Sequence, residues 1–172
     1  MGSDETLKKY AIQGGVLYGA VASLFMLLLS VINTKDNIII TIASLVLSIG
    51  IVAWACTQFK KDNDSFLSLG EAMKIGLIIG AVGGLIYAVY MYLHYEFIFT
   101  NELAEMRELA YEELDQQVAR GEIPNDEGLD MAKKAIGIFT SSFTLSTISL
   151  ITQVVKAFIF GLGCGLIFRT NN

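Results

Sequence analysis

The sequence predicts an all-α membrane protein, with four transmembrane helices and an extramembrane helical hairpin between the third and the fourth. The first observation is composition: 53% of the 172 residues are hydrophobic and only 17% are charged, whereas about a quarter of the residues in soluble domains are charged. The second is that four apolar stretches reach the length of about 20 residues that crosses a bilayer as a helix. The third is that a single proline, Pro124, leaves the rest of the chain free to be helical.

Charge divides the chain into one acidic segment and a slightly basic remainder. Residues 96–135 hold eleven acidic and four basic side chains. We interpret this segment as an insertion within a single membrane domain that covers residues 1–172. No group of lysines or arginines is dense enough to indicate nucleic-acid binding. Cys56 and Cys164 lack the spacing of a metal site or a redox pair, so we expect small buried residues.

The first two predicted spans cover residues 10–32 and 38–59. Cleavage of the first as a signal peptide would leave a hydrophobic stump, so we expect an uncleaved helix. The short polar connection at residues 33–37 predicts that the second helix runs antiparallel beside the first. Trp54 and Phe59, near the end of the second span, suit an interfacial aromatic belt.

The third predicted span, residues 69–95, has glycines at four-residue spacing, which are Gly76, Gly80 and Gly84. In a soluble helix each glycine would cost about 1 kcal/mol, whereas in lipid small residues let a second helix approach closely. Ser68 and Glu71 fit the S-x-x-E capping box that begins a helix. The stretch therefore predicts a transmembrane helix with a packing seam along one face.

Residues 96–135 are predicted to form an acidic helical hairpin. Apolar residues recur at steps of three and four from Leu103 to Val118, which indicates an amphipathic helix with a Glu-rich opposite face. Residues 121–125 break this pattern, and a second helix is expected from Asp126 onward. We interpret the acidic face as solvated rather than cation-binding, because the sequence has no EF-hand spacing.

The fourth apolar stretch, residues 136–168, is too long for one crossing. We therefore place the span at residues 145–168 and expect the preceding turns to lie beyond the hydrocarbon core. Gly161 and Gly165 mark a second packing seam. Four crossings leave both termini on one side, where the basic residues are more densely spaced, so the positive-inside rule predicts cytoplasmic termini and an extracytoplasmic hairpin.

The stretch from Phe66 to Gly76, FLSLGEAMKIG, opens the glycine-rich third span. Together with the short first pair and the Glu- and Met-rich segment before the fourth span, it resembles the bacterial membrane family catalogued as domain of unknown function 4199. The resemblance covers nearly the whole chain. It implies a four-helix, multi-pass protein of the cell inner (cytoplasmic) membrane, and it implies no activity and no catalytic residues.

Polar residues within the spans are the functional candidates, because burying them in lipid is costly. On the fourth span, polar residues at steps of three and four share one helical face, from Ser142 to Lys156. We predict a polar cavity between the second, third and fourth spans, open to the outside with Lys156 at its floor, that binds an anion or passes a small solute. Its candidate residues are Lys156, Gln153, Ser149, Ser146, His94 and Tyr90. The alternative is that the hydroxyls bond to their own helix carbonyls and that Lys156 marks the end of the span.

His94 is the only histidine, and a single histidine cannot build a recognisable zinc site. We expect it to lie near the outer membrane boundary, with pH sensing as the alternative because histidine titrates near neutral pH. The sequence contains no nucleophile elbow, HExxH motif or phosphate loop. We therefore expect neither an enzyme nor a bound cofactor or metal.

Two function classes remain. The favoured prediction is a structural or interaction role, in which the glycine seams within the lipid bilayer support a homo-oligomer or a membrane partner and the acidic hairpin contacts a partner outside. The alternative is a small transporter or channel that uses the polar stripe around Lys156. The alternative for the glycine seam is that it is used within the monomer and packs the third span on the first or the fourth.

Overall fold

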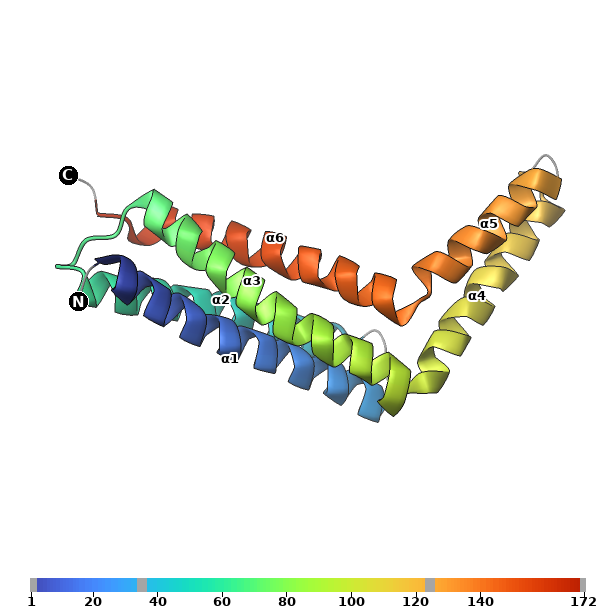
Figure 1. Cartoon of the computed structure of the whole chain (residues 1–172), viewed down its shortest axis with the longest axis horizontal. Helices are drawn as coiled ribbons and strands as arrows, with labels where there is room; N and C mark the ends of the chain where they lie inside the picture. The colour runs from blue at the N-terminus through green and yellow to red at the C-terminus, as the bar shows by residue number, and fades with distance from the viewer. Residues whose placement is uncertain (1–2, 34–36, 123–125, 171–172) are drawn as a thin grey trace. The chain divides into compact units, whose positions relative to one another are not determined.

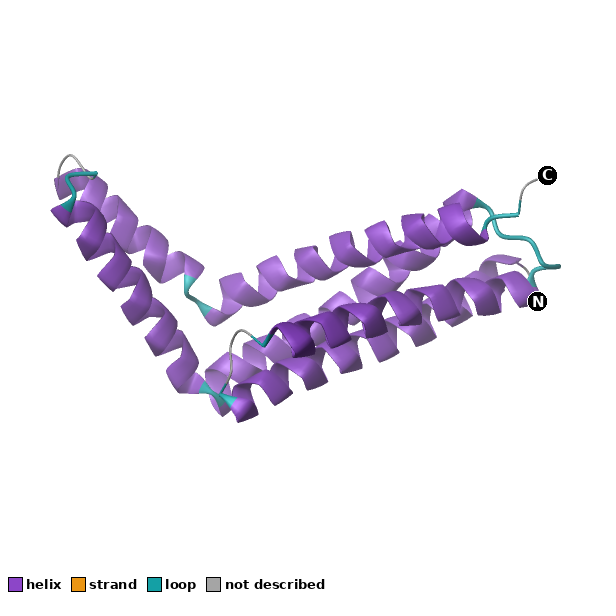
Figure 2. Ribbon diagram, turned by 180° about the vertical axis from the view of Figure 1, so that it is seen from behind, coloured by secondary structure: helices purple, strands orange, loops and turns teal. Residues whose placement is uncertain are grey.

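The computed structural model describes residues 3–33, 37–122 and 126–170. Over these residues the chain consists of helices joined by loops and has no strand, so Figure 2 shows helices in purple and loops in teal but no orange arrow. The expected all-α fold is therefore confirmed. In chain order (Figure 1), the elements are α1 (Ser3–Ile32), α2 (Ile38–Asp62), α3 (Leu69–Leu93), the π-helix η1 (His94–Ile98), α4 (Thr100–Ala119), α5 (Asp126–Phe139) and α6 (Ser142–Phe168).

Four helices in the described part of the chain are long and apolar enough to cross a membrane, namely α1, α2, α3 continued by η1, and α6. They contain the four stretches that the sequence predicts as spans. α1 and α2 extend into flanking polar residues such as Lys8 and Lys60, because lysine is a good helix former and these ends need not lie in the hydrocarbon core. Most of the predicted connection at 33–37 and of the predicted break at 121–125 lies outside the described residues.

The contacts divide the chain into two units. The first unit comprises Met1–Val89 and Ser149–Asn172, and the second comprises Tyr90–Ile148. The first unit therefore holds α1, α2, most of α3 and most of α6, whereas the second holds η1, α4 and α5 with the adjoining ends of α3 and α6. Each unit is described separately below.

Side-chain caps explain where two of the long helices begin. Asn37 precedes α2, and its amide oxygen accepts hydrogen bonds from the backbone N–H groups of Ile39 at 3.0 Å and Ile40 at 3.3 Å. Before α3, the Ser68 hydroxyl accepts from the Glu71 N–H at 3.2 Å, and the Glu71 carboxylate accepts from the Ser68 N–H at 2.8 Å. This reciprocal pair is the capping box that the sequence predicts.

The four long helices of the first unit lie side by side (Figures 1 and 2), and α1 runs antiparallel to α2, as predicted. Tyr10 near the start of α1 meets Trp54 in the second half of α2, with 6.2 Å between the ring centroids. Phe59 is 0% exposed and belongs to the core, so its expected place in an interfacial aromatic belt is wrong. The reason is that Phe59 lies on the face of α2 that packs inward, which hydropathy alone does not reveal when both faces are apolar.

Glycines bring α3 into direct backbone contact with two neighbours. A Cβ atom on Gly76 would lie 2.5 Å from the carbonyl oxygen of Ala157 on α6. A Cβ atom on Gly19 of α1 would lie 2.7 Å from the carbonyl oxygen of Gly83 on α3. No side chain fits at these points, so the small residues allow the close helix packing that is typical of membrane proteins.

The half of the first unit that contains the start of α1 and the end of α6 is densely packed. Val52, Ala55, Ile75 and Ile79 are 0% exposed in one core cluster. Cys56 and Cys164 are free and buried in this cluster, which confirms the expectation from the sequence. The Lys60 ammonium donates to the Phe168 carbonyl oxygen at 2.8 Å and ties the end of α6 to α2.

The second unit buries few side chains, and its elements are joined by half-buried apolar residues together with polar contacts. Its helices α4 and α5 lie side by side in both views (Figures 1 and 2). Leu114 is the only buried residue of α4, and α5 has none. The Arg107 guanidinium on α4 donates to the hydroxyl of Thr140 at 3.2 Å and to its carbonyl oxygen at 3.3 Å, just beyond the end of α5.

The π-helix η1 has no counterpart among the elements predicted from the sequence. The sequence predicts a continuous third helix to residue 95, whereas α3 ends at Leu93 and the wider turn of η1 follows. The Phe99 N–H donates to the His94 carbonyl oxygen at 2.7 Å, five residues back along the chain. π-Helical turns are rare and occur frequently at functional sites.

Candidate functional site

A pocket of about 230 Å³ lies within the first unit, among α1, α2, α3 and α6. At about 30 Å³ per water, this volume is equivalent to seven or eight waters. One part of its lining is apolar and the other carries hydroxyl, amide and ammonium groups. The apolar lining comprises Ala22, Phe25, Met26, Leu29, Ile40, Leu45 and Phe160, and the polar lining comprises Tyr18, Thr41, Ser44, Ser48, Tyr87, Gln153 and Lys156.

The buried end of the pocket is built around a hydrogen bond between α1 and α6. Tyr18, Ser48 and Gln153 are all less than a tenth exposed. The Tyr18 hydroxyl donates to the Gln153 amide oxygen at 2.9 Å. Because the oxygen is engaged in this way, the Gln153 amide presents its two N–H donors on the other side.

The amide nitrogen of Gln153 has no hydrogen-bond partner that the structure describes. Among the described residues, every side-chain nitrogen or oxygen atom that is fully buried has a hydrogen-bond partner. The nitrogen therefore lies on accessible surface, and the accessible surface that Gln153 lines is the pocket. The tyrosine thus fixes an amide whose donors are available to a bound molecule.

Lys156 lines the same pocket, one helical turn after Gln153. It is the fifteenth residue of the 27 in α6, about 21 Å along the axis from Ser142 and about 18 Å from Phe168. The side chain is exposed, so Lys156 forms the rim of the pocket and not its floor, which corrects the expectation from the sequence. Within residues 3–33, 37–122 and 126–170, no carboxylate lines the pocket and Lys156 has no ion pair.

The remaining cavity candidates lie elsewhere. Ser149 is half-buried in the first unit and is not among the described lining residues of the pocket. Ser146, Tyr90 and His94 belong to the second unit. The Ser146 hydroxyl donates to the Ser142 carbonyl oxygen of its own helix at 2.7 Å, as the alternative interpretation of the serines expects.

One contributor to the pocket was missed from the sequence. Five lining residues come from α1, from Tyr18 to Leu29, although the predicted cavity involved only the second, third and fourth spans. Tyr18 was the available signal, because a tyrosine hydroxyl within an apolar span needs a hydrogen-bond partner. The steps between these residues place them on one face of α1.

Comparison with protein-family models finds the family described as Protein of unknown function (DUF4199), over residues 13–170. The chain belongs to this family. The resemblance based on the FLSLGEAMKIG motif is thereby confirmed. No curated protein matches the chain, and no solved structure does either. The matched residues include the whole lining of the pocket, so the pocket lies within the DUF4199 domain.

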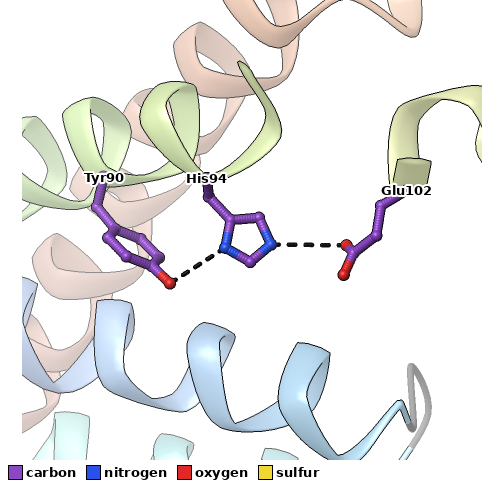
Figure 3. Close-up of polar contacts among 3 residues, drawn as sticks. All are labelled: Tyr90, His94 and Glu102. Atoms are coloured by element: carbon purple, nitrogen blue, oxygen red, sulfur yellow. Dashed lines mark hydrogen bonds and ion pairs between the residues drawn. The ribbon is translucent and has the colours of Figure 1, made fainter. Parts of the chain in front are cut away.

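The second unit of this DUF4199 protein has its own buried polar cluster, centred on His94 (Figure 3). The ring is 0% exposed. Its Nδ1 atom is 3.1 Å from the Tyr90 hydroxyl oxygen, and its Nε2 atom is 3.6 Å from a Glu102 carboxylate oxygen. The ring also stacks on Phe99, with 4.8 Å between centroids. This burial cannot be predicted from the sequence, because the turn of η1 and the acid eight residues away on α4 leave no local pattern.

The glycines predicted as packing residues lie at the contact between α3 and α6. A Cβ atom on Gly80 would be 2.7 Å from the Val154 Cα atom, and one on Gly165 would be 2.7 Å from a Leu69 methyl carbon. Gly76, Gly84 and Gly161 likewise face the opposing helix. The seam that the sequence offers to a homo-oligomer or a membrane partner is therefore occupied by helices of the same unit.

The described lining of the pocket offers hydrogen-bond donors and one positive charge. An ammonium and an amide N–H group bind negatively charged oxygens, and the hydroxyls can donate as well. In the described residues no three acidic, cysteine or histidine side chains are grouped so as to hold a metal ion. The pocket is therefore chemically suited to an anion.

Proposed function

We propose that this DUF4199 protein is an integral protein of a bacterial inner membrane, with cytoplasmic termini, whose four-helix unit binds a small anionic solute. The observation that carries the proposal is Lys156, an ammonium in the middle of α6 beside a pocket without a described carboxylate. In a membrane, a lysine at the centre of a helix costs about 2.5–3.5 kcal/mol on insertion scales. A bound anion would offset part of this cost.

The distribution of packing favours a binding site over an open channel. The lining residues of α1 and α2 lie in the halves of these helices next to their connection, at residues 18–29 and 40–48. The other halves contribute fully buried side chains to the core cluster, such as Ala11 and Val52. An anion held beside Lys156 would therefore meet closely packed side chains on the side of the start of α1 and the end of α6.

The interaction role favoured by the sequence is the second candidate, and it rests on the second unit because the glycine seam is internal to the first. Met131 of α5 is 66% exposed, and Ile138 and Phe139 are 61% and 60% exposed. An exposed apolar face on an extracytoplasmic hairpin would suit a partner protein. Crosslinking in native membranes, with residues of α5 as attachment points, tests this role.

Anion binding is tested by thermal unfolding of the protein in nanodiscs of zwitterionic lipid. Sodium acetate and sodium octanoate are compared with octylammonium chloride at equal ionic strength. We expect at least one of the anions to raise the unfolding midpoint, and Lys156→Met to weaken its binding about tenfold or more, because a hydrogen-bonded charge is lost.

Lys74→Met is the matched control, because Lys74 is an exposed lysine of α3 that does not line the pocket. It should bind the anions as the wild type does. If neither anion shifts the midpoint of the wild type, or if both variants respond as the wild type does, anion binding at this pocket is excluded.

A further inference from the structure

The pocket beside Lys156 has two chemically different parts, and together they identify a class of ligand. Its polar part is formed by Tyr18, Gln153 and Lys156, and its apolar part includes Phe25 and Leu29 of α1. We infer that the ligand is a monoanionic amphiphile, with one negative charge on an apolar tail. This inference rests on the proposed anion binding and adds the nature of the anion.

The single negative charge of the ligand is inferred from the residues that line the pocket. Lys156 is the one cation among the described lining residues, and no described carboxylate accompanies it. A single negative charge would be balanced by this ammonium, whereas a dianion would keep one charge uncompensated in apolar surroundings at a cost of several kcal/mol. The polar part of the pocket therefore matches a monoanion.

The head group follows from the spacing of the donors. Gln153 and Lys156 are three residues apart on α6, so they share a face of the helix at about 4.5 Å of axial separation. The Tyr18 hydroxyl holds the Gln153 amide oxygen at 2.9 Å, which directs the amide N–H groups away from it. Two acceptor oxygens on one small head group can thus be bound at once, one by the amide and one by the ammonium.

The apolar tail of the ligand is inferred from the residues that surround Lys156 at the rim of the pocket. Three exposed neighbours of Lys156 on the outer surface of α6 are aliphatic: Ile151 is 56%, Val155 is 50% and Ile159 is 56% exposed, and Thr152 is exposed beside them. In a membrane these side chains contact lipid hydrocarbon, so a ligand that enters the pocket past Lys156 comes from the bilayer interior. A hydrophilic ion cannot take this route through hydrocarbon, whereas an amphiphile dissolved in the bilayer can.

The volume agrees with a head group and a short length of tail. About 230 Å³ holds seven or eight groups of the size of water. The apolar walls formed by Met26 and Leu45 would contact the first carbons of the tail, and a longer tail would continue into the bilayer. A free carboxylic acid and the phosphodiester head group of an anionic lipid both have this chemistry.

Photocrosslinking tests the inference with three probes that share one diazirine-bearing octyl chain and end in a carboxylate, an alcohol or an amine. The full-length protein is labelled in nanodiscs of phosphatidylcholine, and labelled residues are mapped by mass spectrometry. We expect the carboxylate to label the walls around Met26 and Leu45 about tenfold more than the alcohol, since the charged hydrogen bonds are lost with the alcohol. Equal labelling by all three probes would overturn the inference.

Variants assign the selectivity to the pocket. Lys156→Met should abolish the preference for the carboxylate, Lys156→Arg should keep it, and Lys156→Glu should transfer it to the amine. A folded Lys156→Glu protein that still prefers the carboxylate would contradict the inference. Lys156→Arg keeps the test decisive if the other two variants do not fold, because it retains the charge.

Two further experiments test separately whether the bound anion needs an apolar tail and whether the ligand is a lipid or a free acid. If acetate competes with the carboxylate probe as well as octanoate does, the pocket binds anions but requires no tail, so the inference fails while the proposed function stands. Addition of phosphatidylglycerol to the nanodiscs should reduce labelling if the ligand is a lipid head group, and should leave it unchanged if the ligand is a free acid.

Discussion

The two units of this DUF4199 protein differ in what holds their helices together. In the first unit, backbones touch at glycines, and side chains such as Ile75 and Ile79 are fully buried. In the second unit, α4 buries one leucine and α5 buries nothing, apolar side chains such as Leu103 and Ile136 are only half-buried, and hydrogen bonds such as that from Arg107 to Thr140 add contacts between elements. Added volume is therefore expected to destabilise the first unit, whereas loss of hydrogen bonds is expected to destabilise the second.

The largest expected effect is that of added volume in the first unit. Gly76→Ala would place a methyl group 2.5 Å from the Ala157 carbonyl oxygen and 2.9 Å from the Gly161 Cα atom. Neither is a flexible side chain, so the helices must separate, and we expect a loss of about 2–3 kcal/mol in the free energy of unfolding. Denaturant titration in detergent micelles measures it.

Gly50→Ala is the matched control, because a Cβ atom on Gly50 of α2 would meet nothing within 4 Å. Alanine favours a helix over glycine by up to about 1 kcal/mol, so this variant should be neutral or slightly stabilised. Equal destabilisation by both variants would show that backbone contact does not hold the first unit together.

A loss of about 2 kcal/mol is expected from Arg107→Ala in the second unit, because the guanidinium makes two hydrogen bonds to Thr140. Hydrogen exchange of α4 and α5 should report the loss locally. Arg120→Ala is the control, since its ion pair with Glu122 has both side chains more than half exposed and should contribute at most about 1 kcal/mol. Similar exchange in the two variants would contradict the comparison.

His94→Phe should destabilise the second unit by about 1–2 kcal/mol. The new ring can keep the stacking on Phe99, but the Tyr90 hydroxyl and the Glu102 carboxylate would each lose a polar neighbour. Hydrogen exchange at the start of α4 measures the effect. Unchanged protection would mean that aromatic stacking alone orders this cluster.

The smallest effect is expected from Tyr18→Phe, which removes a hydrogen bond in the first unit without changing its packing. The Gln153 amide oxygen that is left can be reached by water in the pocket, so we expect a loss of about 0.5–1 kcal/mol. Thermal unfolding measures it. A loss as large as that of Gly76→Ala would show that a polar contact also governs the first unit.

The sequence was sufficient for the features that depend on local pattern. Hydropathy located the four long helices, the S-x-x-E spacing located the cap of α3, and the step of three residues placed Gln153 and Lys156 on one face. Contacts between distant residues could not be predicted in this way. Tyr18 is 135 residues from Gln153, and in an apolar helix such as α1 no change of hydropathy distinguishes the inner face from the outer.

The position of η1 and the role of Arg107 were also beyond the sequence. A π-helical turn has no residue pattern of its own, so the change of helix type at His94 could not be inferred from composition. Arg107 and Thr140 are 33 residues apart in the chain, and neither lies in a motif. The sequence did indicate a helix over the residues that form α4, and its amphipathic character stays a prediction.

The place of Lys156 in α6 has a consequence for biosynthesis. α6 is the last of the four apolar helices to leave the ribosome, and it alone has a charged side chain near its midpoint. By that time α1, which supplies Tyr18, and α2, which supplies Ser48, have already been synthesised. In a membrane, helices that are already inserted could receive the ammonium as it enters the bilayer, so we expect integration of the last segment to depend on the earlier ones.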